Sequence, residues 1–407
     1  TDAIDSYLSF GYIPSPSTIY ENVHKLAPAH MLTLKNNVVK TERYWQLDFT
    51  KKLSISESDA AAETIRLLKE AVRIRLYSDV PLGAFLSGGI DSSTVVALMA
   101  ELSSGKVKTF SIGFQEAAFS ELAYARNIAQ RYSTEHHEFI VKPNALEILP
   151  MLVERFGEPY ADSSCIPTYY VSKETRKYVT VALNGDAGDE TFAGYERYQA
   201  MLLAEQLWKL PPLFGKAAQG ISRCISDSIH PKNRLRNIKR FLNAAVLPTQ
   251  ERYLRWVGII SQTAKSNLYT QSFSKQVAAN NPMALLDRYF DRTTTIAMLD
   301  RLLWADTETY LPNDLLVKVD ITSMACSLEA RSPFLDHTLM EFCAKLPTQY
   351  KMKHFVKKYL LKKAIKHIVP DKNVYRRKMG FGIPIGEWFR GELKSFLRET
   401  LTAQQIK

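Results

Sequence analysis

Short apolar runs alternate with segments of helical period between residues 80 and 184, and no other feature constrains the fold as strongly. Strands separated by helical crossovers of this length pair in parallel, so the pattern predicts an α/β domain with a parallel sheet. The expected strands cover 80–87, 107–114, 135–141 and 178–184, and the expected helices cover 92–101, 121–132 and 145–156.

Different patterns flank this core. Residues 1–50 are rich in turns and contain strand-like apolar runs such as LSFGYIP and HMLTL, which indicates the end of a preceding domain and a connector. An amphipathic helix capped by Ser58 follows. From residue 201 to 407 the period is almost entirely helical. We therefore divide the chain into 1–50, an α/β part at 51–200 and a helical part at 201–407.

Composition and cysteine spacing exclude several classes of protein. Apolar residues make up 46% of the 407-residue chain, which is ample for a large core. No apolar run approaches the roughly 20 residues that cross a bilayer, and the N-terminus lacks a secretory signal. The four cysteines lie far apart without metal-binding spacing, so neither a zinc site nor a disulfide framework is expected. These features predict a cytoplasmic protein with reduced thiols and no membrane span.

The net charge of +11 is concentrated in one segment. Between Lys351 and Lys378, eleven lysines and arginines accompany a single acid, Asp371. Such a cluster can bind nucleic acid, can serve a small polyanion such as ATP, or can form a solvated helix face. Charge alone does not separate these alternatives.

The segment LSGGIDSS (86–93) joins the first expected strand to its helix and has the composition of a phosphate-binding turn. Consecutive glycines let the backbone turn tightly and approach a ligand, and the amides and dipole of the helix start attract an anion. Hydroxyls of Ser87, Ser92 and Ser93 add donors, whereas Asp91 would repel a bare phosphate and therefore implies a bridging Mg²⁺. The spacing is neither a Walker loop nor GxGxxG, and an ordinary Gly-rich turn is the alternative.

A second acidic turn, NGDAGDE (184–190), follows the strand expected at 178–184. It would lie at the carboxyl edge of the sheet, where ligands bind in open α/β folds. Three acids within five residues repel one another unless a cation joins them, which favours a metal-binding role for Asp189. An acid in this cluster could also have a raised pKa and transfer protons. A solvated turn is the alternative.

These motifs resemble those of a known family. SGGIDSS resembles the pyrophosphate-binding loop of the ATP pyrophosphatases (PP-loop proteins), and PLGAFLSGGIDSS and NGDAGDETFAGYERY are similar to segments of asparagine synthetase B-type enzymes. The resemblance implies a parallel sheet of the adenine nucleotide alpha hydrolase type, followed by a mostly helical portion. It implies Mg²⁺ ligation by Asp91 and Asp189, and an acidic residue, Asp186, that forms or consumes an acyl-adenylate. The ATP-binding residues that it implies are Leu86, Ser87, Gly88, Gly89, Asp91, Ser92, Ser93, Ile112, Asn184 and Gly185.

The helical part carries the longest resemblance, TETYLPNDLLVKVDITSMACSLEARSPFLDH (307–337). A helix is expected to end before its last proline and to present Glu329, which could orient a catalytic group, and Arg331, which could clamp a carboxylate. An interhelical ion pair is the alternative for both. Further on, YRRKMGF (375–381) resembles a family segment whose lysine contacts phosphate and the developing oxyanion. Lys378 would occupy that position, where a cation aimed at growing charge is a large catalytic contribution.

The resemblance implies an ATP-dependent carbon–nitrogen ligase. A carboxylate, by default the side chain of aspartate, attacks the α-phosphorus of ATP in the presence of Mg²⁺ and releases pyrophosphate. Ammonia then attacks the acyl-adenylate to give asparagine and AMP. The catalytic residues would be Asp186, Glu329 and Lys378.

The resemblance also implies a domain organisation and a set of partners. In the family, ammonia comes from glutamine through an N-terminal glutaminase domain, and residues 1–50 resemble only its tail and the connector. Residues 51–200 would be the nucleotide-binding part of the synthetase domain and residues 201–407 its helical part. We therefore expect this polypeptide not to hydrolyse glutamine. The expected partners are ATP, aspartate and ammonia, with no nucleic acid or membrane, and a homodimer is compatible with the resemblance.

Two other functions remain open at this point. One is an amide-forming ligase of the same fold with another acceptor, such as a β-lactam synthetase, a peptide cyclase or an amidotransferase acting on a glycan precursor. The other is a tRNA-modifying PP-loop enzyme. The basic cluster favours a tRNA substrate, whereas the lack of a catalytic cysteine pair and of an RNA-binding module disfavours it.

Overall fold

The structure is a computed structural model that describes residues 1–114, 120–141, 145–208, 220, 222, 234–291, 295–376, 385–391 and 393–402. The chain forms two compact units. The sheet unit contains Leu68–Asp186, Leu315–Pro333 and Ile365–Lys407, and the helical unit contains Thr1–Leu67, Ala187–Asp314 and Phe334–Ala364. Within the described ranges, every helix is too short or too polar to span a bilayer.

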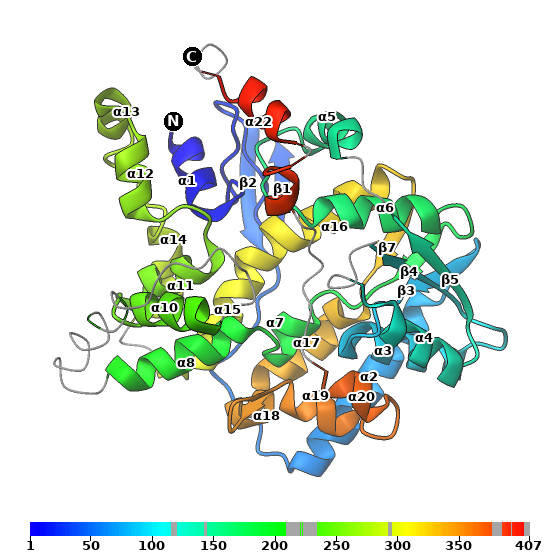
Figure 1. Cartoon of the computed structure of the whole chain (residues 1–407). Helices are drawn as coiled ribbons and strands as arrows, with labels where there is room; N and C mark the ends of the chain where they lie inside the picture. Colours follow the sequence, from blue (N-terminus) through cyan, green and yellow to red (C-terminus); the bar gives the residue numbers. More distant parts are fainter. Residues whose placement is uncertain are drawn as a thin grey trace. The chain divides into compact units, whose positions relative to one another are not determined.

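The centre of the sheet unit is a five-stranded parallel sheet with the strand order β5-β4-β3-β6-β7 (Figure 1). Each strand predicted from the alternation is present, although shorter at its ends, and the predicted α/β class is confirmed. The strands are β3 (Leu82–Phe85), β4 (Lys108–Gly113), β5 (Glu135–Ile140), β6 (Val181–Leu183) and β7 (Glu329–Arg331). The helices are α3 (Ile90–Leu102), α4 (Leu122–Arg131), α5 (Ala145–Phe156), α6 (Cys165–Thr175), α16 (Leu316–Met324), α20 (Asp371–Val374), α21 (Ile385–Trp388) and α22 (Lys394–Thr400).

The helix that follows the central strand lies in the core. Every residue of α3 from Ser92 to Met99 is buried, so this helix is covered on all sides. The neighbouring strand β4 is also buried along most of its length, as expected for a strand between two others in a parallel sheet. The turn between β3 and α3 is therefore held by elements that cannot move without disturbing the core.

The fifth strand lies in a segment for which we expected a helix. α16 ends at Met324, and Ser327 then adopts a left-handed conformation with φ of 56°. The following Leu328 is fully buried against Phe110 and Val179. Burial of this leucine directs the chain along the edge of β6, so the expected helix end around 329–331 is instead the strand β7.

The helical unit consists mainly of helices, with two small hairpins, β1–β2 and β8–β9. Its first elements are α1 (Asp2–Phe10), β1 (His30–Lys35), β2 (Val38–Arg43) and the part of α2 (Glu57–Arg75) up to Leu67, the rest of α2 being assigned to the sheet unit. The central elements are α7 (Gly188–Phe192), α8 (Glu196–Trp208), α10 (Arg234–Ala245), α11 (Thr249–Val257), α12 (Gln262–Leu268), α13 (Gln271–Gln276), α14 (Ala284–Phe290), α15 (Met298–Glu308) and the π-helix η2 (Leu311–Leu315). The last elements are the 3₁₀ turn η3 (Pro333–Leu335), α17 (His337–Lys345), α18 (Thr348–Lys351), β8 (Met352–Lys353), β9 (Val356–Lys357) and α19 (Tyr359–Ala364).

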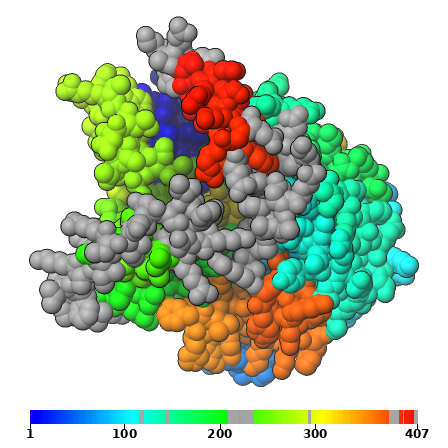
Figure 2. All heavy atoms as spheres, in the orientation of Figure 1, coloured from blue at the N-terminus to red at the C-terminus, as the bar shows by residue number. Residues whose placement is uncertain are grey.

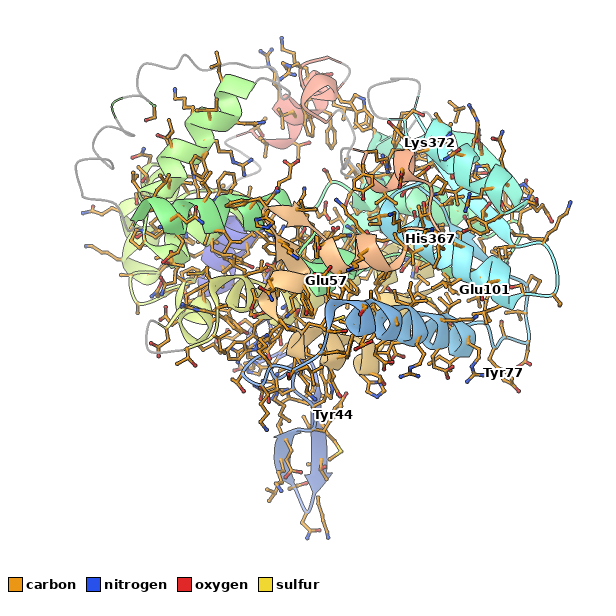
Figure 3. The ribbon with its side chains drawn as sticks, turned by 90° about the horizontal axis from the view of Figure 1, so that it is seen from below. Tyr44, Glu57, Tyr77, Glu101, His367 and Lys372 are labelled. Carbon is orange, nitrogen blue, oxygen red and sulfur yellow. The ribbon has the colours of Figure 1, made fainter. Side chains whose placement is uncertain are left out.

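The apolar run LSFGYIP is not a strand, because Leu8 to Phe10 end helix α1. A polar contact that the apolar pattern hides explains the helix: Asp5 is buried and its carboxylate lies 2.6 Å from Lys265 Nζ. Ser9, one helical turn further on, accepts from the same ammonium at 2.7 Å. The run HMLTL is a strand as expected, and it belongs to the exposed β1–β2 hairpin, beyond Tyr44 in Figure 3.

Candidate active site

The β3–α3 turn is built around Gly88, whose φ of +70° lies in the left-handed region. A Cβ at this position would lie 2.3 Å from the carbonyl carbon of Tyr124 and 2.5 Å from the amide nitrogen of Ala125. Both atoms belong to the backbone of α4, so a side chain would require that helix to move. The segment LSGGIDSS thus forms a tight turn pressed against the start of α4.

Hydroxyl groups close this turn from within. Ser87 Oγ accepts from the Gly89 amide at 3.2 Å and lies 3.0 Å from Ser92 Oγ, which accepts from the Ser87 amide at 3.3 Å. Because α3 begins at Ile90, the backbone amides of its first turn and the positive end of its dipole lie at the β3–α3 turn. These groups can take a phosphate. Ser93, also predicted to bind ATP, is fully buried in α3.

The loop after β6 lies directly against the start of α3. A Cβ on Gly185 would lie 2.8 Å from both Asp91 Cβ and the amide nitrogen of Ser92. The carbonyl of Asp186 accepts from the Ser332 hydroxyl at 2.5 Å, which ties this loop to the end of β7. The structure therefore brings Asp91, Gly185 and Asp186 together at the carboxyl ends of adjacent parallel strands, as the sheet topology requires.

Three further predicted ATP-binding residues are buried beside these loops. The amide of Leu86 donates to the Phe110 carbonyl at 2.8 Å, and the amide of Asn184 donates to the Arg331 carbonyl at 2.9 Å. Both backbone contacts continue the sheet to the edge where the turns begin. Ile112, which lies on β4, belongs to a buried hydrophobic cluster.

Asp189 lies in the helical unit, near the start of α7, and has a partner that sequence reasoning missed. Its Oδ1 lies 2.7 Å from Nζ of Lys358, which is buried. Lys358 is one of eleven basic residues in its segment, and no local pattern separates it from the others. If Asp189 ligates a metal, the same carboxylate also balances this buried ammonium.

Gly194 packs against the Asp189–Lys358 pair, and we expect Gly194→Ala to separate the two charges. A Cβ on Gly194 would lie 1.8 Å from Asp189 Oδ1 and 2.2 Å from Lys358 Cε. We expect a loss of about 1–3 kcal/mol in the free energy of unfolding, measured in urea, because both side chains would have to leave their places. Gly105→Ala, at a site with open space around it, should be close to neutral. An equal effect of the two substitutions would contradict this account.

Glu190 is fully buried and accepts a hydrogen bond from the Tyr195 hydroxyl. Burial, and then the charge of Asp189, raise the pKa of Glu190 to about 7 from an ordinary value of 4.5. The folded state therefore keeps a proton that the unfolded chain has released, so stability should fall as pH rises between these two values.

Glu190→Gln should remove this part of the pH dependence. The glutamine carbonyl can still accept from Tyr195, so we expect the variant to be more stable than the parent by on the order of 1–3 kcal/mol at about pH 8. The two should converge at about pH 4, as measured by urea unfolding across the range. Glu21→Gln, at an exposed site, serves as the control. Parallel pH curves for the parent and Glu190→Gln would refute the prediction.

The structure does not bring Glu329 to the two loops. Glu329 pairs with Val181 at the amino ends of β7 and β6, whereas the loops follow the carboxyl ends. Its carboxylate lies 2.6 Å from Arg331 Nε, and Arg331 Nη1 donates to the carbonyls of Arg75 and Tyr77 at 2.9 and 2.8 Å. Arg331 thus ties the end of α2 to the sheet, and the catalytic role of Glu329 stays a prediction.

The chain around α20 contacts the β3–α3 turn, which sequence reasoning also missed. Asn373 is buried, and its side-chain amide donates to the carbonyls of Gly88 and Tyr124 at 2.9 and 3.0 Å. In Figure 2 the orange surface around α20 borders the cyan surface around α4. Arg376 lies three residues further on, whereas the predicted catalytic Lys378 lies outside the described residues.

Other lysines of the basic cluster have partners within the helical unit. Lys353 and Lys363 contact the Glu57 carboxylate at 3.0 and 2.6 Å, at the start of α2 (Figure 3). Lys351 is buried and lies 2.5 Å from Asp300. The sequence analysis left open that these lysines form a solvated helix face. The structure shows instead that they are ion-paired with Glu57 and Asp300.

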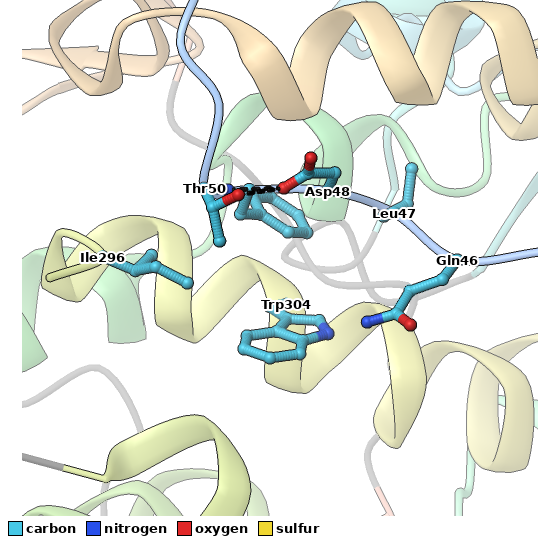
Figure 4. A pocket seen from close by; sticks show the side chains of 7 residues that line it. Gln46, Leu47, Asp48, Thr50, Ile296 and Trp304 are labelled. Carbon is cyan, nitrogen blue, oxygen red and sulfur yellow. Dashed lines mark hydrogen bonds between the residues drawn. The ribbon is translucent and has the colours of Figure 1, made fainter. Parts of the chain in front are cut away.

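The helical unit also contains a pocket of about 320 Å³. Connector residues from Gln46 to Thr50 line it on one side, and Ile296 and the Trp304 ring line it on the other (Figure 4). The amide of Thr50 donates to Asp48 Oδ1 at 2.8 Å, which fixes one edge of the pocket. The predicted site residues are not among those that line it.

The two predicted metal ligands are carboxylates in different units, Asp91 in the sheet unit and Asp189 in the helical unit. Carboxylate oxygens suit Mg²⁺, which usually takes one or two of them together with phosphate and water. Within the described ranges, no group of three or more His, Cys, Asp or Glu side chains is arranged around a common metal position. Asp91 stands at the first turn of α3, where it would face phosphates bound at the turn.

A parallel sheet with a Gly-Gly turn after its central strand and an acidic turn after the adjacent strand makes this chain an α/β protein with a candidate phosphate-binding edge. The family model described as asparagine synthase matches residues 63–407. The chain therefore belongs to the asparagine synthase family, and the resemblance of its motifs to that family is confirmed.

Individual relatives carry two kinds of name. Asparagine synthetase (glutamine-hydrolyzing) 1 from Bacillus subtilis (strain 168) is 31% identical over 409 residues, which cover 99% of this chain and 62% of the relative. Amidase chyE from Penicillium rubens is 26% identical over 99% of this chain and 67% of the relative. An NMN synthetase structure from Francisella tularensis covers 62% of this chain and 94% of its own length, at 14% identity and a TM-score of 0.26. The chain spans about three fifths of the length of two asparagine synthetases that it matches, 62% and 61%.

Proposed function

We propose that the chain catalyses the ATP-dependent amidation of the aspartate side chain, with asparagine, AMP and pyrophosphate as products. The observation that supports this most is the β3–α3 turn, in which Gly88 leaves no room for a side chain and Asp91 lies against Gly185. A turn of this kind suits a phosphate-bearing substrate. Family membership, and the printed name of the Bacillus subtilis relative, favour the same chemistry.

In the proposed reaction, the turn binds the phosphates of ATP through the amides of α3 and the hydroxyls of Ser87 and Ser92. Asp91 and Asp189 would hold Mg²⁺, which offsets the negative charge of the phosphates when bound. A carboxylate oxygen of aspartate forms a bond to the α-phosphorus, and the bond from that phosphorus to the bridging oxygen breaks, releasing pyrophosphate. Ammonia then forms a bond to the acyl carbon, loses a proton and displaces AMP.

The remaining predicted residues enter this scheme as proposals. Asp186 lies on the loop beside Asp91 and is our candidate for taking the proton from the attacking ammonia. Lys378 would balance charge on the phosphates or on the developing oxyanion. Glu329, at the amino end of β7, would act on the reaction only through other groups.

The proposal is tested by pyrophosphate release from Mg²⁺-ATP in the presence of ammonium, with aspartate, with other amino acids and with no acceptor. We expect release that depends on aspartate, with equal amounts of AMP and asparagine. Release that ignores aspartate would keep the nucleotide chemistry and exclude this acceptor. If ATP binds but no pyrophosphate is released with any acceptor, the proposed ligase activity of this chain is wrong.

A second candidate is amide formation on another carboxylate, which the amidase-named relative favours because it aligns over 99% of this chain. The turns that would bind ATP are the same in both cases, and only the acceptor differs. Mass spectrometry of the products formed from a mixture of carboxylic acids would separate the two candidates.

A further inference from the structure

Arg376 places a guanidinium group against the outside of the β3–α3 turn. Its side chain is only 7% exposed, and Nη2 lies 2.5 Å from Glu121 Oε1. The guanidinium carbon lies 4.6 Å from the centre of the Tyr124 ring. A Cβ on Gly89 would lie 3.3 Å from Nη2, so the cation is next to the second glycine of the turn.

Among the described residues, one half of this guanidinium has no acceptor. Nη1 of Arg376 is buried and makes no hydrogen bond within the part of the chain that the structure describes. A buried donor on a charged group is costly when it is left unsatisfied, and such groups persist where a ligand completes them. The planar fork of arginine matches the oxygens of a phosphate group better than a lysine ammonium does.

The backbone around Arg376 is fixed to the same turn. Asn373 donates to the carbonyl of Gly88, the first glycine, and to the carbonyl of Tyr124, whose ring lies beside the guanidinium. Arg376, Asn373, Tyr124 and Gly88 all belong to the sheet unit. The arginine is thus held at the turn by neighbours on both sides, before any ligand binds.

We propose that Arg376 is an anion-binding residue that takes the pyrophosphate portion of ATP at the Gly88–Gly89 turn, and that Glu121 is a positioning residue that holds the guanidinium there. The inference rests on the proposed function, since it assigns a further residue to the same nucleotide site. When the carboxylate of the substrate bonds to the α-phosphorus, the bridging oxygen leaves with the electron pair of the broken bond. Negative charge therefore grows on the pyrophosphate, where a guanidinium stabilises it.

A structural ion pair and an anion site make opposite predictions for the two partners. If the pair only tied α20 to α4, loss of either charge would have the same consequence. If Arg376 binds pyrophosphate, the carboxylate of Glu121 weakens binding by opposing the anion, and Glu121→Gln removes that opposition while keeping an acceptor for the arginine. Removal of the arginine charge should weaken binding, whereas removal of the glutamate charge should strengthen it.

The experiment measures binding of Mg²⁺-pyrophosphate and of AMP to the full chain by isothermal titration calorimetry, with thermal unfolding recorded for every variant. We expect Arg376→Gln to weaken pyrophosphate binding about 10- to 100-fold, as for the loss of a charge-assisted hydrogen bond. AMP binding should stay within about 2-fold, because the proposed contact is to the leaving phosphates. Glu121→Gln should tighten pyrophosphate binding by about 3-fold or more, and Arg376→Lys should be intermediate.

Two results for the variants would overturn the inference and leave the proposed function standing. One is unchanged pyrophosphate binding in Arg376→Gln, and the other is weaker binding in both Arg376→Gln and Glu121→Gln. A parent chain that binds AMP but not pyrophosphate would also overturn it, whereas one that binds neither would overturn the proposed function as well. If Arg376→Gln does not fold, the opposite directions expected of Arg376→Lys and Glu121→Gln decide the matter.

Discussion

Asp91→Asn is expected to reduce pyrophosphate release from Mg²⁺-ATP by at least about 100-fold while the chain remains folded. Asp91 stands in the first turn of α3, and its Cβ lies so close to Gly185 that a Cβ on that glycine would be 2.8 Å away. The substitution keeps the shape and removes the negative charge that would hold Mg²⁺ at the phosphates. A carboxylate at the start of a helix also interacts favourably with the helix dipole. The free energy of unfolding should therefore fall by about 0.3–1 kcal/mol together with the loss of activity.

The matched control is Asp79→Asn, at an exposed aspartate that precedes β3. Pyrophosphate release should be the same as for the parent, because Asp79 lies before the start of β3 and the β3–α3 turn follows the end of that strand. Measurements at several Mg²⁺ concentrations show whether the defect of Asp91→Asn lies in metal binding, because excess metal should then restore part of the activity. Full activity of Asp91→Asn at low Mg²⁺ would rule out a role for this residue as a metal ligand.

Asp306→Ala is expected to cost about 3–5 kcal/mol in the free energy of unfolding, the largest stability effect that we expect from a single side chain. Asp306 is fully buried in the helical unit and accepts hydrogen bonds from the hydroxyls of Tyr198 and Tyr253. Arg197 Nη2 lies 2.6 Å from the same carboxylate, and its guanidinium lies 3.7 Å from the centre of the Tyr195 ring. The alanine would leave a buried cation and two buried donors without an acceptor.

Both tyrosines favour the protonated form that donates to Asp306. Burial, and then the charge of Asp306, raise the pKa of Tyr198 and Tyr253 well above its ordinary value. Chemical denaturation of Asp306→Ala should therefore give a lower midpoint at neutral and alkaline pH alike. Asp287→Ala, at an exposed position of α14, should change stability by less than about 0.5 kcal/mol. A cost below about 1 kcal/mol for Asp306→Ala would mean that the network is replaced by water or repacking.

The α/β core and the turns at its edge could be predicted from local sequence patterns. Parallel strands end at the same edge of a sheet, so Asp91 and Gly185 could be expected near each other once β3 and β6 were identified as neighbours. Gly88 could be expected at a tight turn because only glycine adopts its conformation without cost. These inferences needed the alternation of strands and helices and the composition of two short segments, whereas the pairing of β3 with β6 comes from the structure.

Contacts between distant segments could not be predicted in the same way. Strand β7 depends on Leu328, whose burial beside β6 overrides a helical pattern. Lys358 reaches Asp189 only because two remote segments of the helical unit pack together, and its neighbours Lys353 and Lys363 have unrelated partners. The helix at the N-terminus depends on an ion pair between Asp5 and Lys265, and the spacing of apolar residues contains no sign of it.

The hydrogen bond from Asn373 to Gly88 has a consequence for how the protein is made. It spans 285 positions of the sequence, so a ribosome exposes the Gly-Gly turn long before it synthesises the amide that holds it. Pairing of strands can proceed during translation, but the turn is completed only when the segment around Asn373 returns to it. A nucleotide that binds only the completed turn would stabilise the fully folded chain relative to partly folded chains, because binding shifts the folding equilibrium by mass action. Polypeptides terminated before residue 373 should therefore include the strands of the sheet and gain little protection from nucleotide against proteolysis.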